Sequence, residues 1–237
     1  MNHNKHVLCT SNDAKTVKGE AKGFLTSVLY LAPFKLSGIN VCSHAKWSTC
    51  AETCLNTAGR GIFTQIQQSR ILKTQWFHRD QAAFIDTLVR DIEATIRKAD
   101  RLGLTPCIRP NGTSDLPWEN IKHKGKAIMD IFSNVQFYDY TKVPLRMKRF
   151  LNGEMPSNYH LTFSRSGDND RVVKEVISRG GNVSVVFLHE PPAEWDGVRV
   201  IRGDDHDLRF IDPRGVIVGL KAKGKARKIA TSFVINN

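Results

Sequence analysis

The sequence lacks a long apolar run. No stretch approaches the ~20 consecutive apolar residues of a membrane-spanning helix, so a protein embedded in a bilayer is not expected. Residues 1–20 are polar and lack the apolar centre of a secretory signal peptide. We therefore expect a cytoplasmic protein without a membrane partner, in which the five cysteines stay out of disulfides because the compartment is reducing.

Two signatures of nucleotide binding are also absent. No Gly-x-Gly-x-x-Gly follows a strand-like run, and no Gly-x-x-x-x-Gly-Lys-Ser/Thr occurs, which excludes the dinucleotide fingerprint and the P-loop. The chain has no internal repeat and no linker rich in proline, glycine or serine. We expect a flexible polar arm over residues 1–22 and one catalytic domain over residues 23–237.

Acidic residues are scarce beside basic ones. The chain has 35 Lys and Arg but 23 Asp and Glu, for a net charge of +12. This excess favours polyanionic partners such as nucleic acid, although it also serves solubility. The segment 221–228, KAKGKARK, concentrates enough cations to contact phosphates.

Strand and helix patterns alternate along the chain. In residues 81–101, Phe84, Leu88, Ile92 and Ile96 recur every four residues, with Asp80 as N-cap and Gly103 after the end, which predicts a helix. We expect further helices at 60–76, 118–132, 145–150 and 170–178, and strands at 27–31, 106–108, 135–140, 159–163, 183–187, 198–201 and 216–220. This order predicts an α/β fold with mostly parallel strands, as a small or incomplete (β/α) barrel. A doubly wound open sheet is the alternative, and both put the site beyond the carboxyl ends of the strands.

A cysteine-rich loop follows the first expected strand. Cys42, Cys50 and Cys54 are spaced C-x7-C and C-x3-C, and His44 lies among them. Thiolates bind zinc or an iron–sulfur cluster, with His44 or His206 as a possible fourth ligand. The alternative is that the three cysteines are buried and free, as we expect for Cys107.

Polar segments follow three further strands. Asn111, Ser114 and Asp115 precede Trp118, and Asp115 is either a site carboxylate or a helix cap. Tyr138 and Tyr140 alternate with Asp139, so the phenols point to the face opposite the carboxylate, unless all three belong to a solvated strand end. Arg165 follows the next strand and binds phosphate or lies in a surface loop.

An acidic turn lies near the carboxyl end. Asp204, Asp205, His206 and Asp207 fall within residues 201–212. Clustered carboxylates raise one another's pKa values, which suits acid–base or nucleophilic chemistry. They also suit a hard metal ion, and an ordinary acidic surface turn is the alternative.

Six segments together resemble a known family. They are residues 30–38, the cysteine loop ending at 59–61, 111–119, 137–142, 159–164 and 203–210, and the resemblance spans roughly residues 25–230. They resemble short phage-encoded proteins that are similar to tRNA-guanine transglycosylases and are described as 7-deazaguanine DNA transglycosylases.

The resemblance implies a barrel enzyme, acting in the host cytoplasm, that exchanges guanine in DNA for a small 7-deazaguanine base. It implies one aspartate as nucleophile and another as acid and base, and a zinc held by three cysteines and a histidine. The candidates are Asp115, Asp139, Asp204 and Asp207 for catalysis, Asn111, Ser114, Trp118, Tyr138, Tyr140 and Arg165 for substrate, and Cys42, Cys50, Cys54 and His44 for metal. The cysteines lie earlier, and with a longer first gap, than the zinc cysteines of the larger family.

Two other functions fit the same residues. A radical enzyme would use the cysteine loop for an iron–sulfur cluster that binds S-adenosylmethionine, although the spacing is not C-x3-C-x2-C. A non-catalytic basic protein would bind nucleic acid and use the cysteines for a structural metal. Visible absorbance near 400 nm favours the first, and full activity after alanine substitution of the aspartates favours the second.

Overall fold

The computed structural model describes residues 6–10, 14–44 and 49–237. One mixed sheet runs through these residues in the order β1-β2-β3-β6-β7-β8-β11-β10-β9, with β12 also paired to β8. Its strands are β1 (Leu8–Thr10), β2 (Phe24–Leu29), β3 (Thr105–Arg109), β6 (Gln136–Thr141), β7 (Tyr159–Ser164), β8 (Val183–Phe187), β9 (Glu194–Trp195), β10 (Val198–Arg202), β11 (Ile217–Lys221) and β12 (Val234–Ile235).

The central pairings are parallel. Strands β2, β3, β6, β7, β8, β11 and β10 run the same way, whereas β1 and β9 pair antiparallel at the two ends. The predicted α/β fold with mostly parallel strands is therefore confirmed. Within the described residues the ladder ends at β1 and at β9 without a pairing between them, so the sheet is open there rather than a closed barrel.

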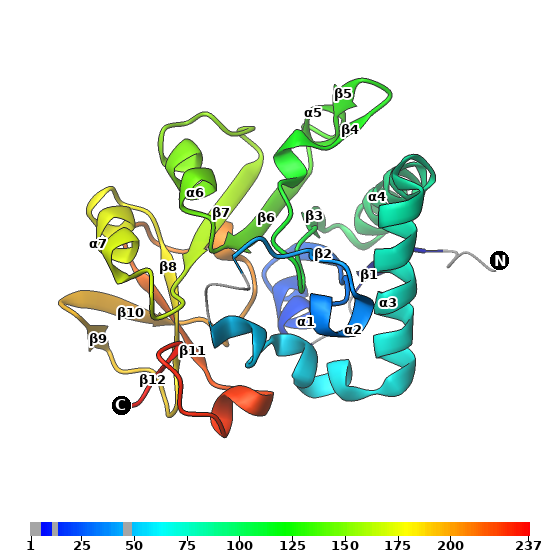
Figure 1. Ribbon diagram of the computed structural model, residues 1–237. Coiled ribbons are helices and arrows are strands. Elements are labelled where there is room, and N and C mark those ends of the chain that lie inside the picture. Colours follow the sequence, from blue (N-terminus) through cyan, green and yellow to red (C-terminus); the bar gives the residue numbers. More distant parts are fainter. Residues whose placement is uncertain (1–5, 11–13, 45–48) are drawn as a thin grey trace.

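Helices cover one face of this sheet (Figure 1). They include α4 (Gln81–Leu102), α5 (Ile128–Ile131), α6 (Pro144–Leu151) and α7 (Asp170–Ser178), and α3 (Thr64–Arg79) packs on α4. Leu88 and Ile92 of α4 share one buried cluster with Ile108, Phe137 and Leu161 of the strands. Burial of these side chains, each worth roughly 1.5–3 kcal/mol, fixes which face the helices cover.

The remaining short elements lie around the sheet. They are α1 (Ala14–Glu20), α2 (Phe34–Ser37), the hairpin of β4 (Lys122–His123) and β5 (Lys126–Ala127), and the 3-10 turns η1 (Thr49–Ala51), η2 (Leu55–Thr57), η3 (Gly59–Ile62), η4 (Trp118–Asn120), η5 (Arg209–Ile211) and η6 (Gly224–Arg227). The segment around η5 contacts β6 and β7, and α1 contacts β2. Tyr138 and Tyr140 point toward this segment, opposite to Asp139, as the alternation predicts.

Helix α4 forms where the sequence predicts it. The Asp80 side chain accepts a hydrogen bond from the Ala83 N–H at 3.0 Å, and Gly103 ends the helix with φ 65°. This left-handed conformation favours glycine at the position after a helix.

Two expectations about elements differ from the structure. The segment 1–22 is not an arm throughout, because Leu8–Thr10 pairs with β2 and Ala14–Glu20 is helical. Asp91 of α4 holds the strand by accepting hydrogen bonds from the N–H groups of Val7 and Leu8. The helix expected at 118–132 is instead η4, the β4–β5 hairpin and the short α5, because Lys124 and Gly125 adopt positive φ and turn the chain back.

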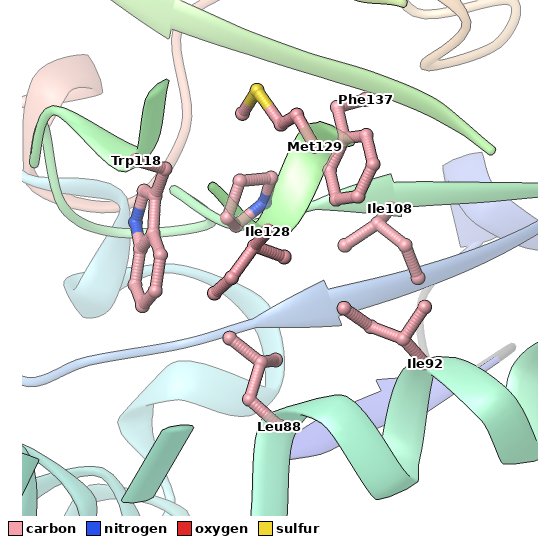
Figure 2. A pocket seen from close by; sticks show the side chains of 8 residues that line it. Leu88, Ile92, Ile108, Trp118, Ile128, Met129 and Phe137 are labelled. Carbon is pink, nitrogen blue, oxygen red and sulfur yellow. The ribbon is translucent and has the colours of Figure 1, made fainter. Parts of the chain in front are cut away.

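A small apolar cavity lies inside the helix-facing core. Figure 2 shows Leu88 and Ile92 of α4 facing Ile108, Ile128 and the side chains around them, with Trp118 at one side. Its volume is about 10 Å³, and its walls carry no polar group suited to fix a water. It is a packing gap in the core and not a ligand site.

Candidate functional site at the carboxyl edge

The carboxyl ends of β2, β3, β6 and β7 lie along one edge of the sheet, since these strands are parallel. Two loops meet there. The Asp115 N–H donates to Val41 O at 2.9 Å, and the backbones of Cys42 and Asp115 form an isolated parallel β-bridge. Gly112 comes so close to the Tyr30 ring that a Cβ would lie 2.6 Å from it. The cysteine loop and the 111–119 loop therefore form one unit.

Asp115 is fixed at this edge by two donors. Its Oδ1 accepts from Arg146 Nη1 at 2.6 Å, and its Oδ2 accepts from the Lys142 main-chain N–H at 2.8 Å. The side chain is 10% exposed. The turn η4 begins after Pro117 without a side-chain cap, so Asp115 does not serve as a helix cap.

Arg146 links Asp115 to a buried network. It makes a two-point ion pair with Glu119, at 2.9 and 2.8 Å, and donates to the Tyr159 hydroxyl at 2.8 Å. Arg146 was not among the predicted site residues because it lies in an expected helix, where arginine is ordinarily solvent-exposed.

Asp139 and Asn111 organise the loop rather than opening onto a site. Asp139 is fully buried and accepts from the Asn111 N–H, from Asn111 Nδ2 and from the Tyr159 hydroxyl, at 2.8 to 2.9 Å. Burial raises the pKa of Asp139 to about 7, against the opposing influence of Arg146 and Arg109. The carboxylate thus ties the 111–119 loop to strand β6.

Three predicted substrate-binding residues are used within the loop. The Asn111 side-chain oxygen accepts from Ser114 Oγ, the Leu116 N–H and Trp118 Nε1, at 2.7 to 3.1 Å. Asn111 and Trp118 are 2% exposed, and the Trp118 ring packs on Phe77. Their polar groups stabilise the loop, which leaves them without an open face for a base.

The three thiols of the cysteine loop influence one another. The pKa of Cys42 is raised to about 12, chiefly by burial and further by negative charge at Asp115, Cys54 and Cys50, whereas Lys142 lowers it. Burial also raises the pKa of Cys54. Neutral thiols are poor nucleophiles, so the burial of Cys42 and Cys54 disfavours covalent catalysis by either of them.

The same thiols test the fit of a zinc ion. Over residues 6–10, 14–44 and 49–237, no group of three or more His, Cys, Asp or Glu side chains is arranged to hold a metal. His44 contacts Ser43 instead, with Nδ1 3.1 Å from the hydroxyl. The donor types suit a soft metal, and among the described residues they are not gathered around one point that a metal would occupy.

Lys142 and Ser164 are further polar residues at this edge. Lys142 Nζ donates to Ser164 Oγ at 2.6 Å and lies 5.2 Å from the centre of the Phe233 ring. The predicted Arg165 is used elsewhere, because it pairs with Asp170 at the start of α7 and donates to Ser232 O at 2.7 Å. Arg165 therefore stabilises the loop and does not face a phosphate site.

Asp207 belongs to a second group, on the sheet face opposite α4, α5, α6 and α7, where α1 also lies. Its carboxylate pairs with Arg109 Nη1 at 2.8 Å and accepts from the Tyr138 hydroxyl at 3.2 Å. Burial alone would raise the pKa of Asp207, but Arg109, Lys15 and Arg209 outweigh burial and hold it below its usual value. Tyr138 is fully buried here, so its phenol lines no open base pocket, and the ring of the partly buried Tyr140 lies under the Arg109 guanidinium.

Asp204 lies on the surface near this second group. It pairs with Lys15 at 2.9 Å and with Lys223 at 2.8 Å. These cations overcome the effect of burial and lower the pKa of Asp204. The expectation that the clustered aspartates raise one another's pKa is therefore wrong for Asp204 and Asp207, because cations from distant segments surround them.

Within the described residues no helix has the length and apolarity needed to cross a membrane.

The larger hollow of about 260 Å³ lies between α7 and the β9–β10 hairpin, and it is lined by none of the predicted site residues. Of the four candidate aspartates, Asp115 alone sits both at the carboxyl edge and beside the cysteine loop.

Comparison with known proteins identifies the family to which the chain belongs. No curated protein and no solved structure matches the chain. A family model described as Gene product 88 matches residues 6–237. Because this match covers nearly the whole chain, the protein belongs to the Gene product 88 family.

Proposed function

We propose that this protein is a DNA base-exchange enzyme that replaces guanine with a 7-deazaguanine base, with Asp115 as nucleophile. The observation that carries the proposal is the setting of Asp115 at the carboxyl edge, where Arg146 and the Lys142 N–H fix its two oxygens. In α/β enzymes this edge is where substrates bind. In this proposal the open sheet works as an incomplete barrel whose strand-end loops make one reactive face.

The other candidate aspartates are less suited to attack a sugar. Asp139 is fully buried behind Asn111, and Asp207 is buried against Arg109. Asp204 is closer to the surface but is bound by two lysines away from the cysteine loop. This leaves Asp115 without a second aspartate beside it, so we assign the proton transfers to Lys142.

The proposed exchange has two balanced steps. In the first, an Asp115 oxygen bonds to the sugar C1′, the bond from C1′ to guanine N9 breaks, and the Lys142 ammonium gives the leaving guanine a proton. In the second, the incoming base loses its N9 proton to Lys142, N9 bonds to C1′, and the bond to Asp115 breaks. Arg146 keeps the carboxylate in place throughout and acts as a positioning residue.

The test is an exchange assay on purified protein. An oligonucleotide with labelled guanine is incubated with a 7-deazaguanine base, and mass spectrometry follows loss of label and gain of the new base. We expect Asp115→Asn to lower the rate by at least ~1,000-fold, as removal of a covalent nucleophile does. The matched control is Asp204→Asn, which should keep its rate.

Either of two results would overturn the proposal. One is a wild-type protein that exchanges no base, and the other is an Asp115→Asn variant that is folded and exchanges at the full rate. Metal analysis and an absorbance spectrum of protein purified without oxygen accompany the assay. Iron with a band near 400 nm would favour radical chemistry instead.

A further inference from the structure

Apolar side chains gather on the surface next to the carboxyl edge. Leu55 of η2, Ile62 of η3 and Phe63 before α3 are 56%, 57% and 58% exposed. Ile66 of α3 and Phe34 of α2 are also exposed. Single exposed apolar residues need no explanation, but a contiguous group marks a binding surface. We call Leu55, Ile62, Phe63 and Ile66 the apolar patch.

The elements of the apolar patch are contiguous in space. Turn η2 contacts η3, and η3 contacts the start of α3. The basic turn η6 contacts η2 from the other side, where the orange-red turn in Figure 1 lies next to the cyan turns. The approach is close, since a Cβ on Gly224 would lie 2.7 Å from Thr57 O.

Cations outnumber acidic groups around the apolar patch, where Glu52 before η2 is exposed. Residues 53–79 and 213–237 contain no Asp or Glu. Lys221 and Lys223 pair with Glu190 and Asp204, but Lys225, Arg227 and Lys228 lie exposed along η6 and just beyond it. A surface that combines apolar groups with unopposed cations suits a partner that combines apolar faces with negative charge.

We propose that the apolar patch and η6 together bind a single strand of DNA. Phe63 offers its ring for a base to stack on, and Lys225, Arg227 and Lys228 contact the phosphates that flank that base. The inference rests on the proposed function for the choice of DNA. It extends that proposal by assigning the strand to particular residues outside the Asp115 site.

A second copy of this chain suits the surface less well. A second copy would offer the cations of η6 no carboxylate from its own apolar patch, because residues 53–79 contain no Asp or Glu, and like charges facing each other across an interface cost several kcal/mol. A DNA strand meets the same cations with phosphates.

The apolar patch also leads to the site. Cys54 directly precedes η2 and lies close enough to Cys42 to influence its thiol, and Cys42 forms a β-bridge with Asp115. A strand that stacks on Phe63 would therefore run along the cysteine loop toward Asp115. An extruded base needs such anchorage of its neighbours while it is held out of the stack.

The test measures binding of a fluorescein-labelled single-stranded oligonucleotide by anisotropy. We expect Phe63→Ala to weaken binding by about tenfold, within the range that loss of one stacked base produces. The matched control is Leu102→Ala, which removes a side chain 53% exposed at the far end of α4 and should leave binding within twofold. Equal effects of both variants would overturn the proposal.

A second pair of variants tests the phosphates. Lys225→Gln and Arg227→Gln should each lower the slope of log affinity against log salt by about one, because each removes one phosphate contact. An unchanged slope overturns the proposal. So does a sedimentation result in which Phe63→Ala dissociates an oligomer while DNA affinity stays the same.

The binding assay separates this inference from the proposed function. If the wild type exchanges no base yet loses affinity on Phe63→Ala, the exchange proposal fails and the strand-binding surface stands. If base exchange depends on Asp115 but DNA affinity does not change on Phe63→Ala, the strand-binding proposal is wrong and the exchange proposal stands.

Discussion

Two arginine–aspartate pairs in this protein look alike in distance and differ in role. Arg146 lies 2.6 Å from Asp115 at the carboxyl edge, and Arg109 lies 2.8 Å from Asp207 on the opposite face. Arg146 also holds Glu119, so it has two carboxylates. The charge of Arg109 is matched by Asp207 alone among the ion pairs of the described residues, beside the ring of Tyr140.

The two pairs differ in what the arginine contacts after its aspartate is removed. A buried arginine that loses one of two carboxylates keeps a partner, whereas a buried arginine that loses its single carboxylate becomes an uncompensated charge. The fold should therefore tolerate loss of Asp115 better than loss of Asp207, which links the sheet face to the η5 segment. A residue's place after a strand does not reveal this distinction.

The largest expected effect breaks the second pair. Asp207→Ala should lower the free energy of unfolding by about 3–5 kcal/mol, because it strands the Arg109 charge in the interior. Asp115→Ala should cost clearly less, since Arg146 keeps Glu119. Urea unfolding of both variants measures the difference. If the double variant Arg109→Met, Asp207→Leu is no more stable than Asp207→Ala, the stranded charge is not the cause.

An effect of intermediate size concerns the pH dependence of the free energy of unfolding, through the buried Asp139. The folded pKa of Asp139 is raised from 3.8 to about 7, so the folded state keeps a proton that the unfolded state has lost. The free energy of unfolding should then fall as pH rises between these values, by up to about 1.4 kcal/mol per pH unit. Asp139→Asn removes this contribution.

The measurement is urea unfolding of the wild type and Asp139→Asn from pH 4.5 to pH 7.5. Other titrating groups, including His160 and His206 with pKa values lowered to about 4 by burial, act alike in both proteins and cancel in the difference. A difference that does not change with pH would show that Asp139 stays ionised throughout.

The smallest effect concerns the surface aspartate. Asp204→Asn should lower the free energy of unfolding by less than about 1 kcal/mol, because its lysine partners are partly exposed to water and salt. Thermal unfolding at low and high salt measures it, and the cost should shrink at high salt. A cost as large as that of Asp207→Ala would erase the distinction between the two aspartates of this turn.

The sequence predicted the elements that depend on local pattern. Helix α4 has its apolar repeat, its Asp80 cap and its Gly103 end within one segment, and the parallel strands follow from alternation with helices. The hairpin inside 118–132 was missed because apolar residues of this segment suit helical spacing while the chain turns at Lys124 and Gly125; these residues are Trp118, Ile121, Ile128 and Met129.

The candidate site was predicted only in part. Asp115 and Cys42 were placed correctly after their strands, and the structure brings them together. The partners that decide each aspartate's state come from far along the chain, as Arg109 does for Asp207 and Lys15 does for Asp204. Propensity and spacing describe neighbours in sequence, so they carry no signal for such pairs.

The pairing of Arg109 with Asp207 can form only late in synthesis of the chain. The two residues are 98 positions apart, so strand β3 leaves the ribosome long before its counter-charge is made. At typical rates of 5–20 residues per second, Arg109 waits about 5 to 20 s for Asp207. During that interval the face that carries Arg109 and Tyr138 stays exposed to solvent, and it becomes buried only when the last third of the chain has been made.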